Sequence, residues 1–120
     1  MAITANLAVA VVALLHVAFM VVEMFLWKKP FGRRVFGLSP ELATSSAVLA
    51  ANQGLYNGFL AAGLIWSLSP TVATFSLRVF FLGCVIIAGV FGAVTAKRSI
   101  LWIQAVPGAV ALALVLATRA

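Results

Sequence analysis

Four long apolar stretches, separated by short polar segments, make up nearly the whole chain. They cover about residues 4–27, 42–66, 72–96 and 100–118. An α-helix needs roughly 20 residues to cross a hydrocarbon core about 30 Å thick, and each stretch is about that long. The pattern predicts an all-α integral membrane protein, a bundle of four transmembrane helices that forms a single transmembrane domain over residues 1–120.

The polar segments carry signals that end and start helices. Residues 28–30, Lys-Lys-Pro, follow the first stretch, and a proline with two charges opposes further helix inside a membrane. Residues 39–41 are typical of a helix start, because Ser39 suits the N-cap, Pro40 the first helical position and Glu41 the first turn. We therefore expect the second helix to start near Pro40 and enter the membrane near Ala43, after a short basic loop over residues 28–41.

Charge is distributed unevenly between the loops. Most of the Lys and Arg residues follow the first and third helices: Lys28, Lys29, Arg33, Arg34, Lys97 and Arg98. The loop after the second helix, residues 67–71, carries no charge. Because cytoplasmic loops are enriched in Lys and Arg, we expect the two basic loops in the cytoplasm and both termini on the opposite side. The expected location is the cell inner membrane, with a multi-pass topology.

Composition supports the membrane interpretation. Hydrophobic residues make up 65% of the chain, charged residues only 8%, and the mean hydropathy is +1.22, which excludes a soluble domain. The net charge of +6 does not indicate a nucleic-acid partner, because the basic residues stand at the ends of apolar stretches. There they meet anionic headgroups, so membrane lipids are the expected partners. Cys84 is the single cysteine, which rules out a disulfide within the chain.

Small residues indicate how the helices pack, because close backbone approach replaces the hydrophobic effect inside a membrane. The second and third stretches each carry a row of them: Gly54, Gly58 and Ala62, then Gly83, Ala88, Gly89 and Gly92. We interpret these rows first as contacts within the chain, and a homodimer face is the alternative.

Polar residues inside the apolar stretches are the candidates for a functional site, since each costs free energy in hydrocarbon unless it has a partner. The first stretch holds His16 and Glu23, seven residues and about 10 Å apart along one helix face. The second holds four polar residues within an arc of roughly 140°: Asn52, Gln53, Tyr56 and Asn57.

The depth of each polar residue in the membrane follows from its distance along the helix from the expected cytoplasmic end, at about 1.5 Å per residue. The count places His16 roughly 17 Å deep, beside residues 52–57 at roughly 13 to 21 Å, and predicts that His16 reaches Asn52, Gln53 or Tyr56. Glu23 and Gln104 both fall about 7 Å deep and form a second polar layer. Arg78, near the outer end of the third helix, is interpreted as an interfacial anchor.

Two segments resemble a known family. They are residues 16–27 and residues 49–63, and the most specific part is the run Asn-Gln-Gly-Leu-Tyr-Asn-Gly at 52–58. On these segments the chain resembles the small membrane proteins of the domain of unknown function 1304 family. The resemblance implies a four-helix membrane protein and carries no established activity.

The residues support three hypotheses for function. In the first, a small amphiphilic ligand binds in the membrane, and His16 and Glu23 act as the catalytic acid and base. The residues expected to bind the ligand are the other polar ones: Asn52, Gln53, Tyr56, Asn57 and Gln104. The alternatives are a small proton-coupled exporter that works as a dimer, and an accessory subunit of a membrane complex. All these polar groups could also serve only as hydrogen bonds between helices.

The sequence specifies no cofactor. One histidine and one membrane glutamate leave a zinc shell incomplete, and two axial haem histidines would need a dimer.

Overall fold

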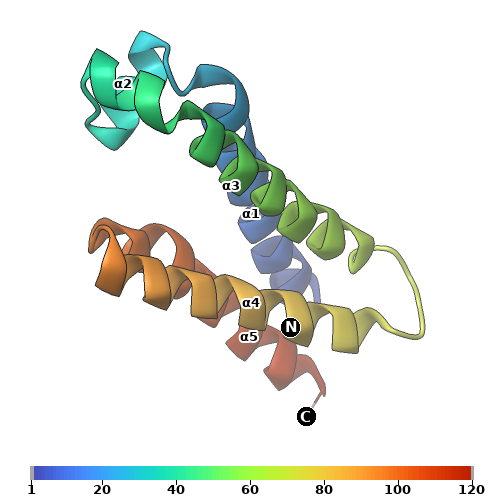
Figure 1. Ribbon diagram of the computed structural model, residues 1–120. Helices are drawn as coiled ribbons and strands as arrows, with labels where there is room; N and C mark the ends of the chain where they lie inside the picture. Colours follow the sequence, from blue (N-terminus) through green and yellow to red (C-terminus); the bar gives the residue numbers. More distant parts are fainter. Residues whose placement is uncertain (1, 120) are drawn as a thin grey trace. The chain divides into compact units, whose positions relative to one another are not determined.

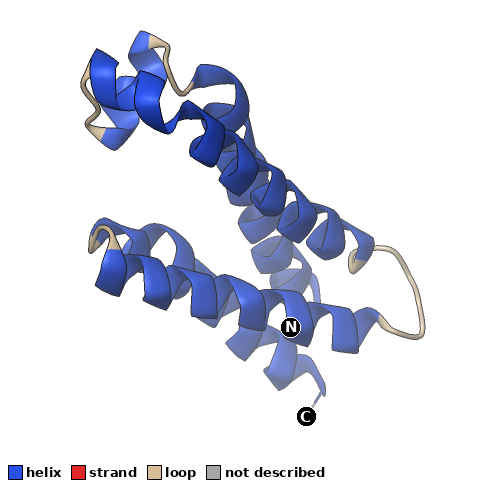
Figure 2. Ribbon diagram, in the orientation of Figure 1, coloured by secondary structure: helices blue, strands red, loops and turns tan. Residues whose placement is uncertain are grey.

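The computed structural model describes residues 2–119, and helices make up nearly all of this part of the chain (Figure 1). Figure 2 shows only short loops between the helices. The elements are α1 (Ala2–Val21) with the π-helical turn η1 (Val22–Leu26), α2 (Pro30–Phe36), α3 (Pro40–Trp66), α4 (Thr74–Thr95), and the π-helical turn η2 (Leu101–Ala105) with α5 (Val106–Arg119). Residues 2–119 contain no strand, so the all-α prediction is confirmed for them.

Three segments are long and apolar enough to cross a membrane. They are Ala2–Leu26, Thr74–Thr95 and Leu101–Arg119. The fourth predicted span, α3, has sufficient length at 27 residues but does not reach the same apolarity. The polar run at 52–57 lowers its hydropathy. The chain therefore has the helices of a membrane protein, with one helix of mixed character.

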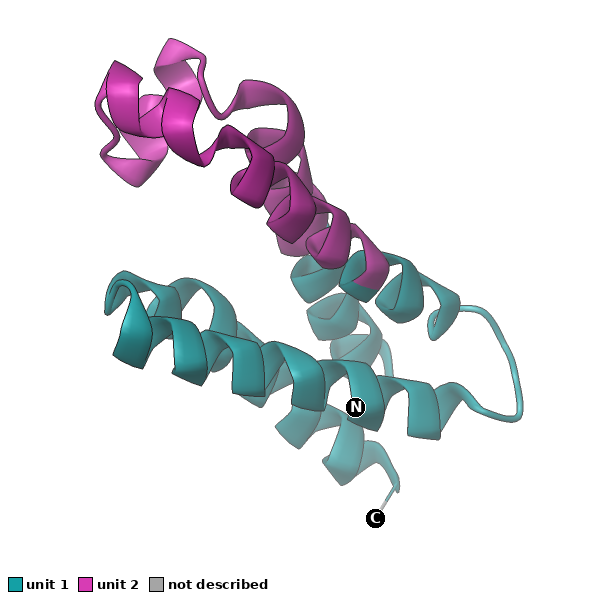
Figure 3. Cartoon of the chain, in the orientation of Figure 1, with its two compact units in different colours: residues 1–14, 60–120 teal, residues 15–59 magenta. Residues whose placement is uncertain are grey.

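The chain forms two compact units (Figure 3). The first comprises residues 1–14 and 60–120, and the second comprises residues 15–59. In the first unit, α1, α3, α4 and α5 all contribute to one apolar core, whose largest buried side chains are Val9, Val12, Leu64, Leu82, Val85 and Val115. α4 and α5 run side by side, and η2 packs on α4.

In the second unit, the end of α1 and the first part of α3 form a helical hairpin closed by α2. Residues 28–41 were expected to be a loop, and the short helix α2 corrects this prediction. Pro30 stands at its first turn, where the missing N–H costs nothing, and Gly37 ends it with φ +65°. Ser39 then caps α3 as predicted, because its Oγ accepts the backbone N–H of Leu42 at 3.1 Å.

Glycines mark the closest helix contacts within each unit. A Cβ atom placed on Gly54 would lie 2.6 Å from Cγ of Met24, and one on Gly58 would lie 2.8 Å from Sδ of Met20. The row on α3 thus packs within the chain, although Ala62 is exposed. On α4, Gly89 and Gly92 contact η2 and Ile100, whereas a Cβ atom on Gly83 would meet nothing within 4 Å and Ala88 is exposed.

Candidate functional site

Glu23 is the best-defined polar group of the second unit. It lies in η1, near the end of α1, and only 3% of its surface is exposed. Its Oε1 accepts a hydrogen bond from Nδ2 of Asn57 at 2.5 Å, and its Oε2 accepts one from Nε2 of Gln53 at 2.8 Å. One carboxyl group is therefore held by two neutral amides of the facing helix α3.

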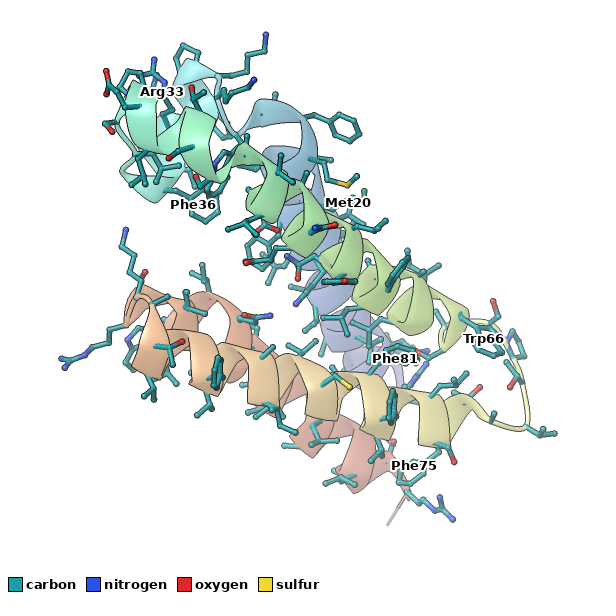
Figure 4. The ribbon with its side chains drawn as sticks, viewed as in Figure 1. Met20, Arg33, Phe36, Trp66, Phe75 and Phe81 are labelled. Carbon is teal, nitrogen blue, oxygen red and sulfur yellow. The ribbon has the colours of Figure 1, made fainter. Side chains whose placement is uncertain are left out.

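The two amides differ in their surroundings. Asn57 is buried, with 8% of its surface exposed, whereas Gln53 is exposed and reaches Glu23 from the edge of the hairpin. They stand four residues apart, so both project from the same side of α3. Gly54 and Gly58, each one residue further on, let α1 approach closely enough for these bonds to form (Figure 4, where Met20 is labelled).

Asn52 and Tyr56 do not share this position. Asn52 is exposed, and Tyr56 has 61% of its surface exposed with its ring 6.0 Å from the ring of Phe59. The four residues predicted as one polar face of α3 thus divide into two pairs. Gln53 and Asn57 hydrogen-bond to Glu23. The amide of Asn52 and the phenol of Tyr56 are exposed on the surface of the helix.

His16 and Gln104 belong to different units. His16 is fully buried, and its ring meets the edge of Phe19 at 5.3 Å. Gln104 lies half-buried in η2, within the first unit. The proposed layer of Glu23 with Gln104 therefore joins residues of different units, and it stays a prediction.

The predicted depth of Glu23 relative to the polar residues of α3 is wrong. The count set Glu23 about 8 to 14 Å closer to the cytoplasmic end than residues 53–57. Glu23 nevertheless hydrogen-bonds to residues 53 and 57. The first turns of α3 pack beside the end of α1 and α2, where Trp27 Nε1 donates to Ser46 Oγ at 3.0 Å. The Trp27 ring also packs on Phe36, which Figure 4 labels. Counting depth from Ala43 therefore began too early in α3, because Ser46, three residues later, lies beside Trp27.

Both π-helical turns contain a polar residue that the sequence marked as a candidate. η1 holds Glu23 and η2 holds Gln104. η2 has a local cause, because Pro107 has no N–H to donate, and the Val106 N–H instead bonds to the carbonyl of Leu101. A π-helical turn re-aims the side chains on it and is frequent at functional sites. The sequence pattern predicts a regular helix at both places.

Arg78 is a second polar residue whose position the sequence did not predict. Its side chain is buried, with 9% of its surface exposed, and the interpretation as an interfacial anchor stays a prediction. Its Nε and Nη2 donate to the carbonyl oxygen of Ser67 at 3.3 and 3.2 Å. Within residues 2–119, no group of three His, Cys, Asp or Glu side chains is placed to hold a metal ion.

Comparison with known families adds to this geometry. The family model described as a protein of unknown function, DUF1304, matches residues 10–116. The chain belongs to the DUF1304 family. The matched range includes every candidate site residue of this DUF1304 protein, from His16 to Gln104. Neither the curated proteins nor the solved structures contain a match to it.

Proposed function

We propose that this DUF1304 protein is a multi-pass protein of the inner membrane with four spans, in which α3 crosses despite its polar residues. At about 1.5 Å per residue, its 27 residues extend roughly 40 Å. Charge supports the crossing. With four spans, residues 28–34 and 97–98 fall on one side, as the positive-inside rule favours, whereas three spans would divide these basic loops between both sides. Both termini are then extracytoplasmic.

The function we propose is the binding of a small amphiphilic ligand at Glu23. The single observation that carries this is a buried carboxyl group whose described hydrogen bonds come from two neutral amides. Amides satisfy its lone pairs without neutralising it, so the ionised group retains a net charge in an apolar environment. An ionisable residue inside a membrane helix is typical of a functional site. A ligand with an amine head and an apolar tail complements this group.

The surroundings of Glu23 fit such a ligand. Gln53 covers one carboxyl oxygen from the exposed edge of the hairpin, so rotation of this single side chain would open Oε2. Asn57, which is buried, would keep Oε1 in place. The exposed side chains of Tyr56 and Phe59, on the same helix, offer an aromatic surface for the tail. In this proposal Glu23 also exchanges a proton with the ligand, and His16, on the same helix, serves the proton transfer.

The test uses the two glutamates of the chain. Dicyclohexylcarbodiimide reacts with carboxyl groups in apolar surroundings, and mass spectrometry can locate the adduct. With the protein in phosphatidylcholine nanodiscs, we expect N,N-dimethyldodecylamine, a tertiary amine that cannot form an amide with the activated carboxyl group, to slow the modification of Glu23. Dodecanol, with the same tail and no amine, should not. Glu41, which is exposed at the start of α3, is the internal control, and its low modification should be the same in all samples. Equal protection by the amine and the alcohol would contradict the proposal.

Variants separate a site from a purely structural role. Glu23→Gln keeps the shape and one acceptor oxygen, so it should abolish binding of N,N-dimethyldodecylamine while the protein still folds. His16→Ala should leave binding intact and abolish proton exchange. If instead each variant lost only folded protein, in proportion to function, these residues would be hydrogen-bond contacts between helices.

A second candidate function is supported by the exposed pair Asn52 and Tyr56. Polar side chains that face lipid at the middle of a span are costly, so a second copy of the chain could cover them. That arrangement would suit a dimeric proton-coupled exporter, and a larger membrane partner would suit an accessory subunit. Cysteine cross-linking tests it: in a Cys84→Ser background, Asn52→Cys should form a disulfide-linked dimer, while Ala88→Cys, exposed on α4, should not.

A further inference from the structure

The first unit contains a pocket that the carboxylate site does not involve. It is a cavity of about 370 Å³ between the start of α4 and the end of α5. Two arginines, Arg78 and Arg119, line it together with three threonines and Phe75. Figure 4 labels Phe75 in the first turns of α4. The cavity is large enough for a phosphate group with a glycerol or similar substituent.

The arginines bring positive charge that their own unit does not balance. Residues 1–14 and 60–120 contain no Asp or Glu, while Lys97, Arg98, Arg78 and Arg119 all belong to this unit. Arg78 is buried, and the carbonyl of Ser67 is a neutral acceptor. A buried guanidinium without a negative partner costs free energy, and an anion in the pocket would remove that cost.

Both guanidinium groups keep donors available. Arginine has five N–H donors, and Arg78 uses Nε and Nη2 for Ser67, which leaves its Nη1 group. Arg119 lies with its Cζ atom 4.1 Å from the centre of the Phe75 ring, a cation–π contact that fixes the guanidinium and uses none of its N–H groups. Two arginines with free N–H groups on one cavity match the oxygens of a phosphate.

The neighbouring polar groups are already engaged. The hydroxyl of Thr74 donates to the carbonyl of Thr71 at 2.9 Å, and that of Thr118 donates to the carbonyl of Val115 at 2.7 Å. The recognition therefore rests on the arginines. α4 also begins at this pocket, where the Thr71 hydroxyl accepts the backbone N–H of Ala73 at 2.8 Å, and the positive end of a helix dipole favours an anion there.

We propose that this pocket binds a phosphate-bearing anion through Arg78 and Arg119. Arginine side chains bind phosphate oxygens through charge-assisted, often bidentate hydrogen bonds. The ends of two candidate spans form the pocket, so in the proposed four-span topology it lies at the depth of lipid headgroups on the extracytoplasmic side. A lipid phosphodiester and free phosphate share the chemistry that the arginines recognise, and the experiment distinguishes them.

Calorimetry on the full chain in a neutral maltoside detergent measures the binding. The ligands are a short-chain phosphatidylglycerol, inorganic phosphate, and a short-chain diacylglycerol that lacks the phosphate. Tighter binding of phosphatidylglycerol than of inorganic phosphate supports a lipid site, and equal binding supports a site for the free anion. Binding of the diacylglycerol as tight as that of phosphatidylglycerol would overturn the proposal, and so would no binding of either phosphate compound.

Variants connect the binding to the two residues. Arg119→Gln should weaken phosphatidylglycerol binding by about tenfold or more, the usual loss for one charge-assisted hydrogen bond. Arg98→Gln removes the same charge at the other end of α4 and is the matched control, expected to change binding less than about twofold. Because Arg78 is buried, its variant could misfold, and Phe75→Leu, which removes the ring under Arg119, provides the second test. Equal affinities of the Arg119→Gln and Arg98→Gln proteins would refute the assignment.

Discussion

The contact of Gly89 with η2 permits a prediction with an internal control on the same helix. A Cβ atom on Gly89 would lie 2.6 Å from the backbone nitrogen of Ala105, 2.8 Å from its Cβ and 2.9 Å from its Cα. Two of these atoms are backbone, so rotation of a side chain cannot make room. α4 and η2 would have to separate by about 1 Å to restore ordinary contacts of about 3.5 to 4 Å. Overpacking of this kind costs about 1–3 kcal/mol.

Gly83→Ala is the control, because a Cβ atom at Gly83 meets nothing within 4 Å. Both substitutions replace glycine by alanine within α4, and the gain in helix propensity of about 1 kcal/mol is the same in both. The difference between the two variants therefore isolates the packing cost, and we expect Gly89→Ala to be less stable than Gly83→Ala by about 1–3 kcal/mol.

The assay is unfolding in mixed micelles, with sodium dodecyl sulfate added to the protein in maltoside detergent and helix content followed by circular dichroism. Ala105→Gly in the Gly89→Ala background removes one of the three close atoms and should restore only part of the stability. Equal stability of the Gly89→Ala and Gly83→Ala proteins would refute the contact between α4 and η2.

Three further predictions test the rest of the chain. A reporter fused after Ala120 should show an extracytoplasmic location and one inserted within residues 31–37 a cytoplasmic location; opposite signals would reverse the topology. Asn57→Leu should lower the free energy of unfolding by about 1–3 kcal/mol in the same assay, because the buried carboxyl group of Glu23 loses a hydrogen-bond donor. Asn52→Leu, at an exposed position, should lower it by less than about 0.5 kcal/mol. Equal losses would show that the hydrogen bond to Glu23 contributes nothing to stability. Gly37→Ala should cost about 1 kcal/mol, since φ +65° is strained with a side chain, and an unchanged midpoint would contradict this.

The sequence predicts the helices well because apolar length and end signals are local properties. Residues 39–41 predicted the start of α3, and Ser39 caps it. The short helix α2 was missed because a seven-residue basic segment has no apolar stretch to reveal it, although Pro30 and Gly37 bound it as helix start and stop signals. The π-helical turns were missed for another reason. η2 results from Pro107, which has no N–H to donate, and a hydrophobic pattern does not record a missing backbone donor.

The sequence predicts which residues belong to the candidate site, but it does not predict which of them form hydrogen bonds with one another. Polar residues in apolar stretches identified Glu23, Gln53 and Asn57, since each is costly in a membrane without a partner. Which of them meet depends on the register between α1 and α3. The glycines at 54 and 58 set that register by admitting Met24 and Met20, and the contact is visible only with both helices in place.

Glu23 and Arg78 have opposite signs of charge but the same kind of partner. Glu23 accepts from two amides, and Arg78 donates to a backbone carbonyl, so the hydrogen bonds described for each group are made with neutral dipoles. An ion pair would satisfy both the hydrogen bonds and the charge, and would leave nothing for a ligand. A dipole satisfies only the hydrogen bonds, so an ionised group beside it would still attract an opposite charge strongly in an apolar environment. This shared feature is the basis of both proposals, a cationic ligand for the site in the second unit and an anionic one for the pocket in the first.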